Sequence, residues 1–178
     1  KLLEFNLYED LAYSQIGHVY DLMGDKEKAF TNYSKALEIN PTLDIALMNI
    51  GRYFFYENDY PKARENLLKS IEVSSLSALK SHSFQVLGEI ELLDSNNIAK
   101  AEDYFIKSLG EDPNFVTSIV SMAEIQYEYA KIEKERGNDF SLNLGVSFSY
   151  INQALDIQTE NVFAYLQQAK NFILNSEF

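Results

Sequence analysis

The sequence predicts an all-α fold built as an array of helical repeats. Three positions return after 34 residues, two of them small and one large: Gly17 and Gly51, Ala29 and Ala63, Tyr33 and Leu67. A fixed period of this length is typical of repeats that each contain two helices. A hydrophobic content of 46% with only 7 Gly and 3 Pro indicates an ordered chain. At 178 residues it is long enough to bury a sizeable core.

The residues within one period carry a more specific pattern. The first period contains an aromatic, an aliphatic-Gly pair, a second aromatic, then small and large residues before a proline: Tyr13, Ile16, Gly17, Tyr20, Ala29, Tyr33, Ala36 and Pro41. This pattern resembles the tetratricopeptide repeat (TPR). The resemblance implies a right-handed α-solenoid of antiparallel helix pairs, a TPR-like superhelix, that serves as an interaction scaffold and not as an enzyme.

The pattern predicts a single array of repeats over residues 1–178. Repeats are expected at approximately 10–43, 44–77, 81–115 and 116–160, followed by a capping helix over 161–178. The third repeat is displaced, because Gly88 follows Gly51 by 37 residues. In the fourth, Ser147 stands where Ala29 stood and follows Ala123 by 24 residues instead of 12. A lengthened helical hairpin is therefore expected there, and its segment from Tyr129 to Phe148 is a candidate second contact surface.

Small and large residues have distinct expected places in each helix pair. Gly17 and Ala29 should lie where the two helices approach most closely, at roughly 8 to 10 Å between axes. Large side chains such as Ile16 and Tyr33 should fill the seam with the next pair. In the last helix, from Asn161 to about Asn175, an apolar set is expected to be buried: Val162, Tyr165, Leu166, Ala169, Phe172 and Ile173. The intervening polar residues should face solvent: Gln167, Gln168, Lys170 and Asn171.

The composition and the absence of known motifs argue against most kinds of catalytic, metal and cofactor site. The absence of Cys excludes disulfides, a thiol nucleophile and zinc–thiolate sites. The chain contains no P-loop, dinucleotide fingerprint, His-Glu-x-x-His or EF-hand loop, so no catalytic, metal or cofactor site is predicted. A net charge of −12 argues against nucleic acid as a ligand. No stretch is long and apolar enough for direct membrane insertion. The compartment is left unknown, with a soluble, cytoplasmic protein favoured.

The resemblance also implies where a partner would bind, on a groove lined by the first helix of each pair. The family's groove positions in this chain include Asn49, Arg52, Phe55, Tyr56, Gln85, Glu89, Glu124, Tyr127 and Glu128. Because this set mixes aromatic surface with carboxylates, the expected partner is a protein or peptide with apolar and basic residues.

One subgroup of the family grips the C-terminal carboxylate of heat-shock chaperones with a Lys, two Asn, and a further Lys and Arg. The corresponding residues here are Ser14, His18, Asn49, His82 and Val86. Only one Asn matches, so this carboxylate clamp is not expected.

Three functional interpretations remain open. The first is a non-enzymatic scaffold or adaptor that binds a peptide or protein segment in the concave groove, as part of a larger assembly. The second is a secretion or type IV pilus assembly factor, similar to the pilotins. The third is a regulatory TPR segment of a larger multidomain protein.

Overall fold

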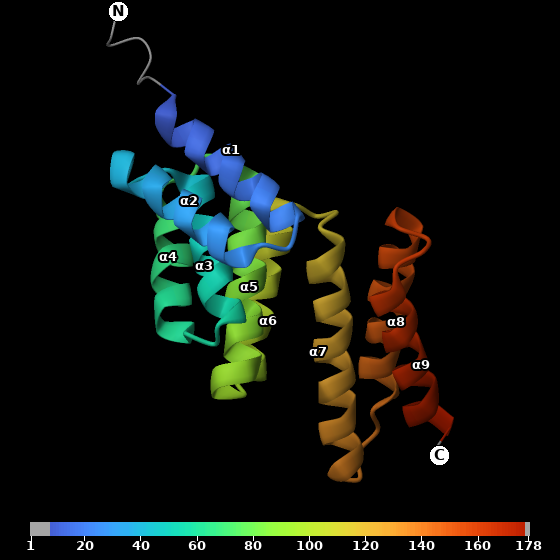
Figure 1. Ribbon diagram of the computed structural model, residues 1–178. Helices are drawn as coiled ribbons and strands as arrows, with labels where there is room; N and C mark the ends of the chain where they lie inside the picture. Colours follow the sequence, from blue (N-terminus) through green and yellow to red (C-terminus); the bar gives the residue numbers. More distant parts are fainter. Residues whose placement is uncertain (1–7, 177–178) are drawn as a thin grey trace, which may run out of the picture. The chain divides into compact units, whose positions relative to one another are not determined.

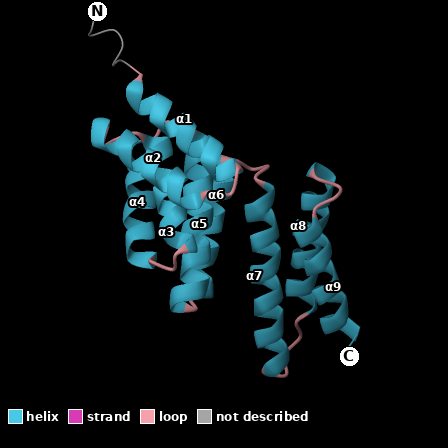
Figure 2. Ribbon diagram, in the orientation of Figure 1, coloured by secondary structure: helices cyan, strands magenta, loops and turns pink. Residues whose placement is uncertain are grey.

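The computed structural model describes residues 8–176, and every regular element in that range is an α-helix (Figures 1 and 2). The helices are α1 (Glu9–Leu22), α2 (Lys26–Ile39), α3 (Asp44–Tyr56), α4 (Tyr60–Val73), α5 (Ser77–Ser95), α6 (Ile98–Glu111), α7 (Val116–Glu135), α8 (Ser141–Ile157) and α9 (Val162–Ser176).

The chain forms two compact units, Lys1–Asn96 and Asn97–Phe178. In the first, α1 packs on α2, α3 on α4, and α3 also contacts α2 and α5. In the second, α7 packs on α6 and α8, and α9 contacts both α7 and α8. Each unit is therefore built from helices that pack on their neighbours in sequence. The predicted all-α class, a solenoid of helical repeats, is confirmed.

Local sequence signals explain where the helices begin and end. Asp25, Asp59 and Asn97 precede α2, α4 and α6, and each side chain accepts a hydrogen bond from the backbone N–H three residues later. Such N-caps satisfy donors that the first turn of a helix leaves unpaired. Gly24 and Gly137 end the preceding helices with φ of +78° and +73°, a region that glycine enters without strain.

The small residues lie at the closest approach of paired helices, as predicted. A Cβ atom added to Gly17 would lie 2.9 Å from ring carbons of Tyr33 on α2. The same atom on Gly51 would lie 2.7 Å from Cγ of Leu67 on α4. Both distances are shorter than a van der Waals contact, so these crossings exclude any side chain larger than hydrogen.

The predicted seam role of Ile16 is wrong. Its side chain is 44% exposed, whereas its counterpart Ile50 is buried. On α3, Ile50 is enclosed because the helix contacts α2, α4 and α5. Ile16 instead lines an open apolar hollow on α1 together with Val19 and Met23, and among the described residues no preceding helix covers it.

The predicted orientation of the last helix is also wrong. On α9 the buried residues are Ala164, Gln167, Asn171 and Leu174. The residues expected in the core are exposed: Val162, Tyr165, Leu166, Ala169, Phe172 and Ile173. The physical reason is a hydrogen-bonded polar contact with α8, where Nδ2 of Asn171 donates to Oγ of Ser147 over 2.8 Å. This bond and small Ala164, which packs with Ala123 and Ile151, bring the polar side of α9 inward.

The fourth helix pair is long, with 20 residues in α7 and 17 in α8, compared with 14 each in α1 and α2. The additional turns have a small core of their own, formed by Ala130, Phe140, Leu144 and Leu174. Because Leu174 belongs to α9, the end of this hairpin is packed against the last helix. The predicted contact surface from Tyr129 to Phe148 is therefore buried in part.

An ion-paired cluster joins α4 to α5 in the first unit. Arg64 donates from Nε to Oε1 of Glu91 over 3.3 Å and from a terminal nitrogen to Oδ2 of Asp94 over 2.7 Å. The side chain of Glu91 is 3% exposed. The carboxylates raise the pKa of Arg64, although partial burial opposes that shift most strongly. A carboxylate this deeply buried depends on its cationic partner.

Candidate functional site

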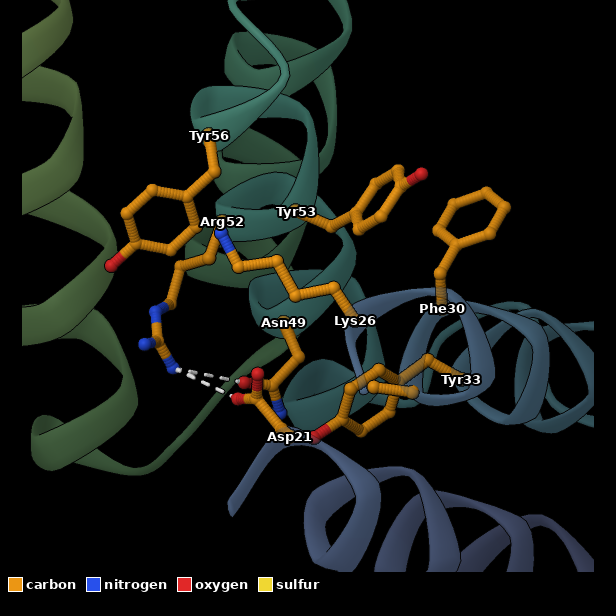
Figure 3. A pocket seen from close by; sticks show the side chains of 9 residues that line it. Asp21, Lys26, Phe30, Tyr33, Asn49, Arg52, Tyr53 and Tyr56 are labelled. Carbon is orange, nitrogen blue, oxygen red and sulfur yellow. Dashed lines mark hydrogen bonds and ion pairs between the residues drawn. The ribbon is translucent and has the colours of Figure 1, made fainter. Parts of the chain in front are cut away.

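A pocket in the first unit lies where α1, α2 and α3 meet (Figure 3). Its lining is Asp21 from α1, then Lys26, Ala29, Phe30 and Tyr33 from α2, and Asn49, Arg52, Tyr53 and Tyr56 from α3. The cavity volume is about 20 Å³. This is room for about one water molecule or one polar atom of a ligand.

The charged side chains Arg52 and Asp21 of the pocket interact only weakly with each other. One terminal nitrogen of Arg52 donates to Oδ1 of Asn49 over 3.3 Å and lies 3.9 Å from Oδ2 of Asp21, as the dashed lines in Figure 3 show. Both members of the ion pair are about one-third exposed. A pair this long and exposed contributes little to stability. The guanidinium therefore keeps donors for a further ligand.

Aromatic rings form the walls. The ammonium of Lys26 lies 4.6 Å from the ring centroid of Tyr56, within the range of a cation–π contact. The rings of Phe30 and Tyr53 stack with centroids 4.3 Å apart. The hydroxyl of Tyr53 donates to Oε1 of Glu27 over 3.1 Å. Tyr56 itself is 52% exposed and offers apolar surface at the rim.

Tyr33 stands out among the polar groups of the pocket. Its side chain is 2% exposed, and within the described part of the chain its hydroxyl has no hydrogen-bond partner. Burial raises the pKa of Tyr33 to about 12, with a smaller contribution from the charge of Asp21. The phenol is therefore neutral at pH 7 and free to donate. A buried hydroxyl left unpaired costs about 1–3 kcal/mol, so this group is poised for an acceptor.

The structure brings three of the predicted groove residues together, since Asn49, Arg52 and Tyr56 all line this pocket. Asn49 is itself buried and hydrogen-bonds the carbonyl oxygen of Ile45. Phe55 lies outside the pocket, with its ring centroid 5.3 Å from that of Tyr56 and 6.3 Å from that of Tyr60. Gln85 is buried on α5 and Glu89 is half-buried. Of the three predicted groove residues that line the pocket, Arg52 and Tyr56 are therefore the accessible ones.

The remaining predicted residues lie on α7 in the second unit, and their carboxylates already have partners. Glu124 forms an ion pair with Lys170 at 3.1 Å, and Glu128 forms one with Lys131 at 2.7 Å. The ammonium of Lys131 also lies 5.6 Å from the ring centroid of Tyr127. A basic ligand would have to compete with these lysines.

The sequence did not indicate the other six residues that line the pocket: Asp21, Lys26, Ala29, Phe30, Tyr33 and Tyr53. The 34-residue period could have indicated Asp21. Asp21 precedes the predicted groove residue Phe55 by 34 residues, and Phe55 lies about one helical turn after Arg52. Tyr33 was predicted as a core residue, which its burial confirms. That its hydroxyl would be left without a partner depends on the helix crossings and has no signature in the sequence.

Two searches of residues 8–176 gave negative findings. No three His, Cys, Asp or Glu side chains gather there in a way that could hold a metal ion. None of the helices in that range is both long and apolar enough to cross a membrane.

Comparisons with known proteins agree with this architecture. The family model described as tetratricopeptide repeat matches residues 11–43. A solved structure, the APC/C hetero-tetramer Cut9–Hcn1, superimposes with a TM-score of 0.74 at 14% sequence identity, covering 93% of this chain and 30% of that chain. This chain therefore spans less than two-thirds of that relative. No curated protein sequence gives a significant match.

Two further solved structures align over most of both chains but with lower scores. YrrB, titled a TPR protein with an unusual peptide-binding site, has a TM-score of 0.47 at 16% identity and covers 94% of this chain and 96% of that chain. The Pseudomonas aeruginosa protein pilF has a TM-score of 0.40 at 20% identity and covers 93% and 99%. Scores this low carry no weight for the fold or function of this chain.

The matched repeat at residues 11–43, the glycine crossings at Gly17 and Gly51, and the superposition on the Cut9–Hcn1 structure agree with one another. The chain therefore contains a tetratricopeptide repeat at residues 11–43 and shares the all-α repeat fold of the Cut9–Hcn1 structure.

Proposed function

We propose that this chain is a non-enzymatic interaction scaffold that binds an extended peptide or protein segment at the pocket formed by α1, α2 and α3. The observation that carries the proposal is that the buried hydroxyl of Tyr33, which has no hydrogen-bond partner among residues 8–176, and the weakly paired guanidinium of Arg52 belong to the lining of one pocket. Both residues line the pocket, whose volume is about 20 Å³, and each has a hydrogen-bond donor. A main-chain carbonyl oxygen of a bound segment fits that space and accepts from both.

The rim of the pocket supplies the apolar part of such a contact. Tyr56 is half-exposed, and aromatic rings bury large area at low cost in side-chain entropy. An apolar side chain next to the bound carbonyl would pack on this ring. Specificity would then come from the apolar side chain, because every peptide supplies carbonyl oxygens.

The charge of the chain bears on partner selection. A net charge of −12 favours the approach of a basic partner through the long-range field. Basic residues flanking the apolar anchor are therefore part of the proposed ligand. The Cut9–Hcn1 structure, on which this chain superimposes with a TM-score of 0.74, is a hetero-tetramer, which supports a place for this chain in a larger assembly. The pilus-factor and multidomain alternatives remain predictions.

The test is selection of peptides from a displayed library against the 178-residue chain. Dissociation constants of the selected peptides are then measured for the parent and for Tyr33→Phe and Arg52→Gln. Loss of one hydrogen-bond donor should weaken binding roughly tenfold for each variant. Arg136→Gln, which removes an exposed arginine from the end of α7, is the control and should bind as the parent does. Equal affinities across all four proteins would refute the pocket as the site.

A further inference from the structure

A lysine covers the aromatic ring at the rim of the pocket in the first unit. The ammonium of Lys26 on α2 lies 4.6 Å from the ring centroid of Tyr56 on α3, and Figure 3 shows its side chain reaching toward that ring. Tyr56 is half-exposed and is the ring on which an apolar side chain of a bound segment would pack. The ammonium and the apolar side chain compete for this ring, so Lys26 opposes the binding of an apolar residue alone.

Lys26 is held at the ring only weakly. Within the described part of the chain no carboxylate forms an ion pair with its ammonium, and a cation–π contact at an exposed ring is weak. The carboxylates next to it in sequence have other partners. Asp25 pairs with Lys28 at 2.6 Å, and Glu27 accepts a hydrogen bond from the hydroxyl of Tyr53 over 3.1 Å. The ammonium can therefore move to a stronger, anionic partner.

The lining of the pocket carries more positive than negative charge. Its charged residues are Lys26, Arg52 and Asp21. Asp21 lies 3.9 Å from Arg52 and neutralises at most one of the two cations. Lys26 is also the first residue of α2, where the helix dipole favours a negative charge. In a chain of net charge −12, this pocket is thus a local site that suits an anionic group.

We propose that Lys26 selects bound segments in which an aspartate or a glutamate lies next to the apolar residue. The ligand carboxylate draws the ammonium of Lys26 away from Tyr56, because an ammonium–carboxylate hydrogen bond is stronger than a cation–π contact at an exposed ring. The ring of Tyr56 then packs on the apolar side chain. This inference rests on the proposed function, since it requires a segment bound at this pocket, and it adds that the apolar and acidic residues are recognised together.

An acidic residue at this position is compatible with a basic partner. The field of the net charge of −12 acts on the partner as a whole, whereas Lys26 acts on one side chain at hydrogen-bond distance. The expected ligand therefore has one apolar–acidic pair within a segment that is basic overall. Because the carboxylate belongs to an internal side chain, this contact also differs from a clamp that grips the C-terminal carboxylate of a chain.

Two blocked peptides serve as probes: acetyl-Lys-Ser-Glu-Leu-Glu-Ser-Lys-amide, and the same peptide with Gln in place of both Glu. A Glu on each side of Leu serves either chain direction. Each probe is titrated into the isotope-labelled 178-residue chain at about 0.15 M salt, where charges are screened beyond about 8 Å. Shifts of the backbone amide NMR signals give the dissociation constants.

The proteins compared are the parent, Lys26→Ala, Lys28→Ala and Tyr33→Phe. Lys28→Ala is the matched control for Lys26→Ala. It removes the same charge from the same turn of α2, but the ammonium of Lys28 lies 5.3 Å from the ring centroid of Tyr20 and not at Tyr56. Circular dichroism of each variant establishes that helix content is retained.

The preference for the Glu probe is the ratio of the two dissociation constants. It should be about threefold to fivefold larger in the parent and in Lys28→Ala than in Lys26→Ala. Lys26→Ala should also bind the Gln probe about twofold to fivefold more tightly than the parent does, because Tyr56 is then uncovered. A Lys26→Ala protein that keeps the preference, or that binds the Gln probe no better than the parent, would overturn the proposal.

Tyr33→Phe separates failure of this inference from failure of the proposed function. If Tyr33→Phe weakens the Gln probe while Lys26→Ala changes neither probe, the pocket is the binding site and only the role of Lys26 is wrong. If neither probe binds the parent, or if Tyr33→Phe leaves both affinities unchanged, the proposed function fails and this inference fails with it.

Discussion

The hydroxyl of Ser147 on α8 donates a hydrogen bond of 2.7 Å to the carbonyl oxygen of Ala123 on α7. The same oxygen of Ser147 accepts a bond of 2.8 Å from Nδ2 of Asn171 on α9. Asn171 in turn accepts from Nε2 of Gln167 over 3.2 Å. All three polar side chains are buried. One hydroxyl thus links three helices of the second unit, and its network decides which side of α9 faces inward.

Replacing Ser147 with alanine should lower the free energy of unfolding by about 1–3 kcal/mol, because the buried amide of Asn171 then loses an acceptor. Urea denaturation followed by circular dichroism measures the change. Ser149→Ala, on the exposed side of α8, is the matched control and should stay within about 0.5 kcal/mol of the parent. If both variants unfold at the same urea concentration, the network contributes no stability.

Two glycines should respond to alanine in opposite directions. Gly51→Ala forces a Cβ to within 2.7 Å of Leu67 and should cost about 1–3 kcal/mol by overpacking. Gly145→Ala on α8 meets nothing within 4 Å and should stabilise by about 0.5–1 kcal/mol, since alanine is the better helix former. Thermal unfolding compares the two variants. A Gly51→Ala protein as stable as the parent would contradict the close helix crossing.

The ion cluster of α4 and α5 predicts non-additive effects. Arg64→Met removes an ion-pair partner of the buried carboxylate of Glu91 and should lower the free energy of unfolding by up to about 3–5 kcal/mol. Adding Glu91→Leu removes the buried negative charge, so the double variant should regain most of the lost free energy of unfolding. The free energies of unfolding of the parent, both single variants and the double variant form a thermodynamic cycle. Additive losses would show that the two side chains are not coupled.

Tyr33→Phe should separate stability from binding. Removing a buried hydroxyl that has no partner within residues 8–176 should raise the free energy of unfolding of the free protein by about 1 kcal/mol or more. The same substitution should raise the dissociation constants of the peptides selected from the displayed library. Denaturation and binding are measured on one preparation. A destabilised variant would mean that this hydroxyl is satisfied in the folded protein.

Alkaline unfolding provides a pH test. Burial raises the pKa values of Tyr33 and Tyr129 to about 12, and at Tyr129 a hydrogen bond to Glu102 adds to the shift. Both folded-state values exceed the unfolded value of about 10. The associated stability is therefore fully present below about pH 10 and is lost as pH rises towards 12.

The free energy of unfolding should accordingly fall more steeply between about pH 10 and pH 12 in the parent than in Tyr33→Phe/Tyr129→Phe. Denaturation curves collected across this range measure both slopes, and phenolate absorbance reports the titration directly. Parallel slopes would mean that both phenols titrate at ordinary values.

The sequence by itself determined the helical repeat and its tightest contacts. The spacing of Gly17 to Gly51 and of Tyr33 to Leu67 is local information, because a small residue and a large one meet wherever paired helices cross. Turn residues such as Gly24 likewise act through their own backbone angles. The sequence also predicted Arg52 and Tyr56 as groove residues on the first helix of a pair, and both side chains line the pocket.

Only the tertiary structure decided which sides of the terminal helices are covered and which polar groups lack partners. Hydrophobic periodicity identifies the apolar face of α9 but not whether a neighbouring helix packs on it. Asn171 is buried because Ser147, 24 residues earlier, satisfies its amide, and this contact depends on the helix crossing. The helix crossings likewise leave the hydroxyl of Tyr33 without a hydrogen-bond partner in the part of the chain that the structure describes. Burial and hydrogen bonding are relations between distant residues, so they appear only when the helices are packed.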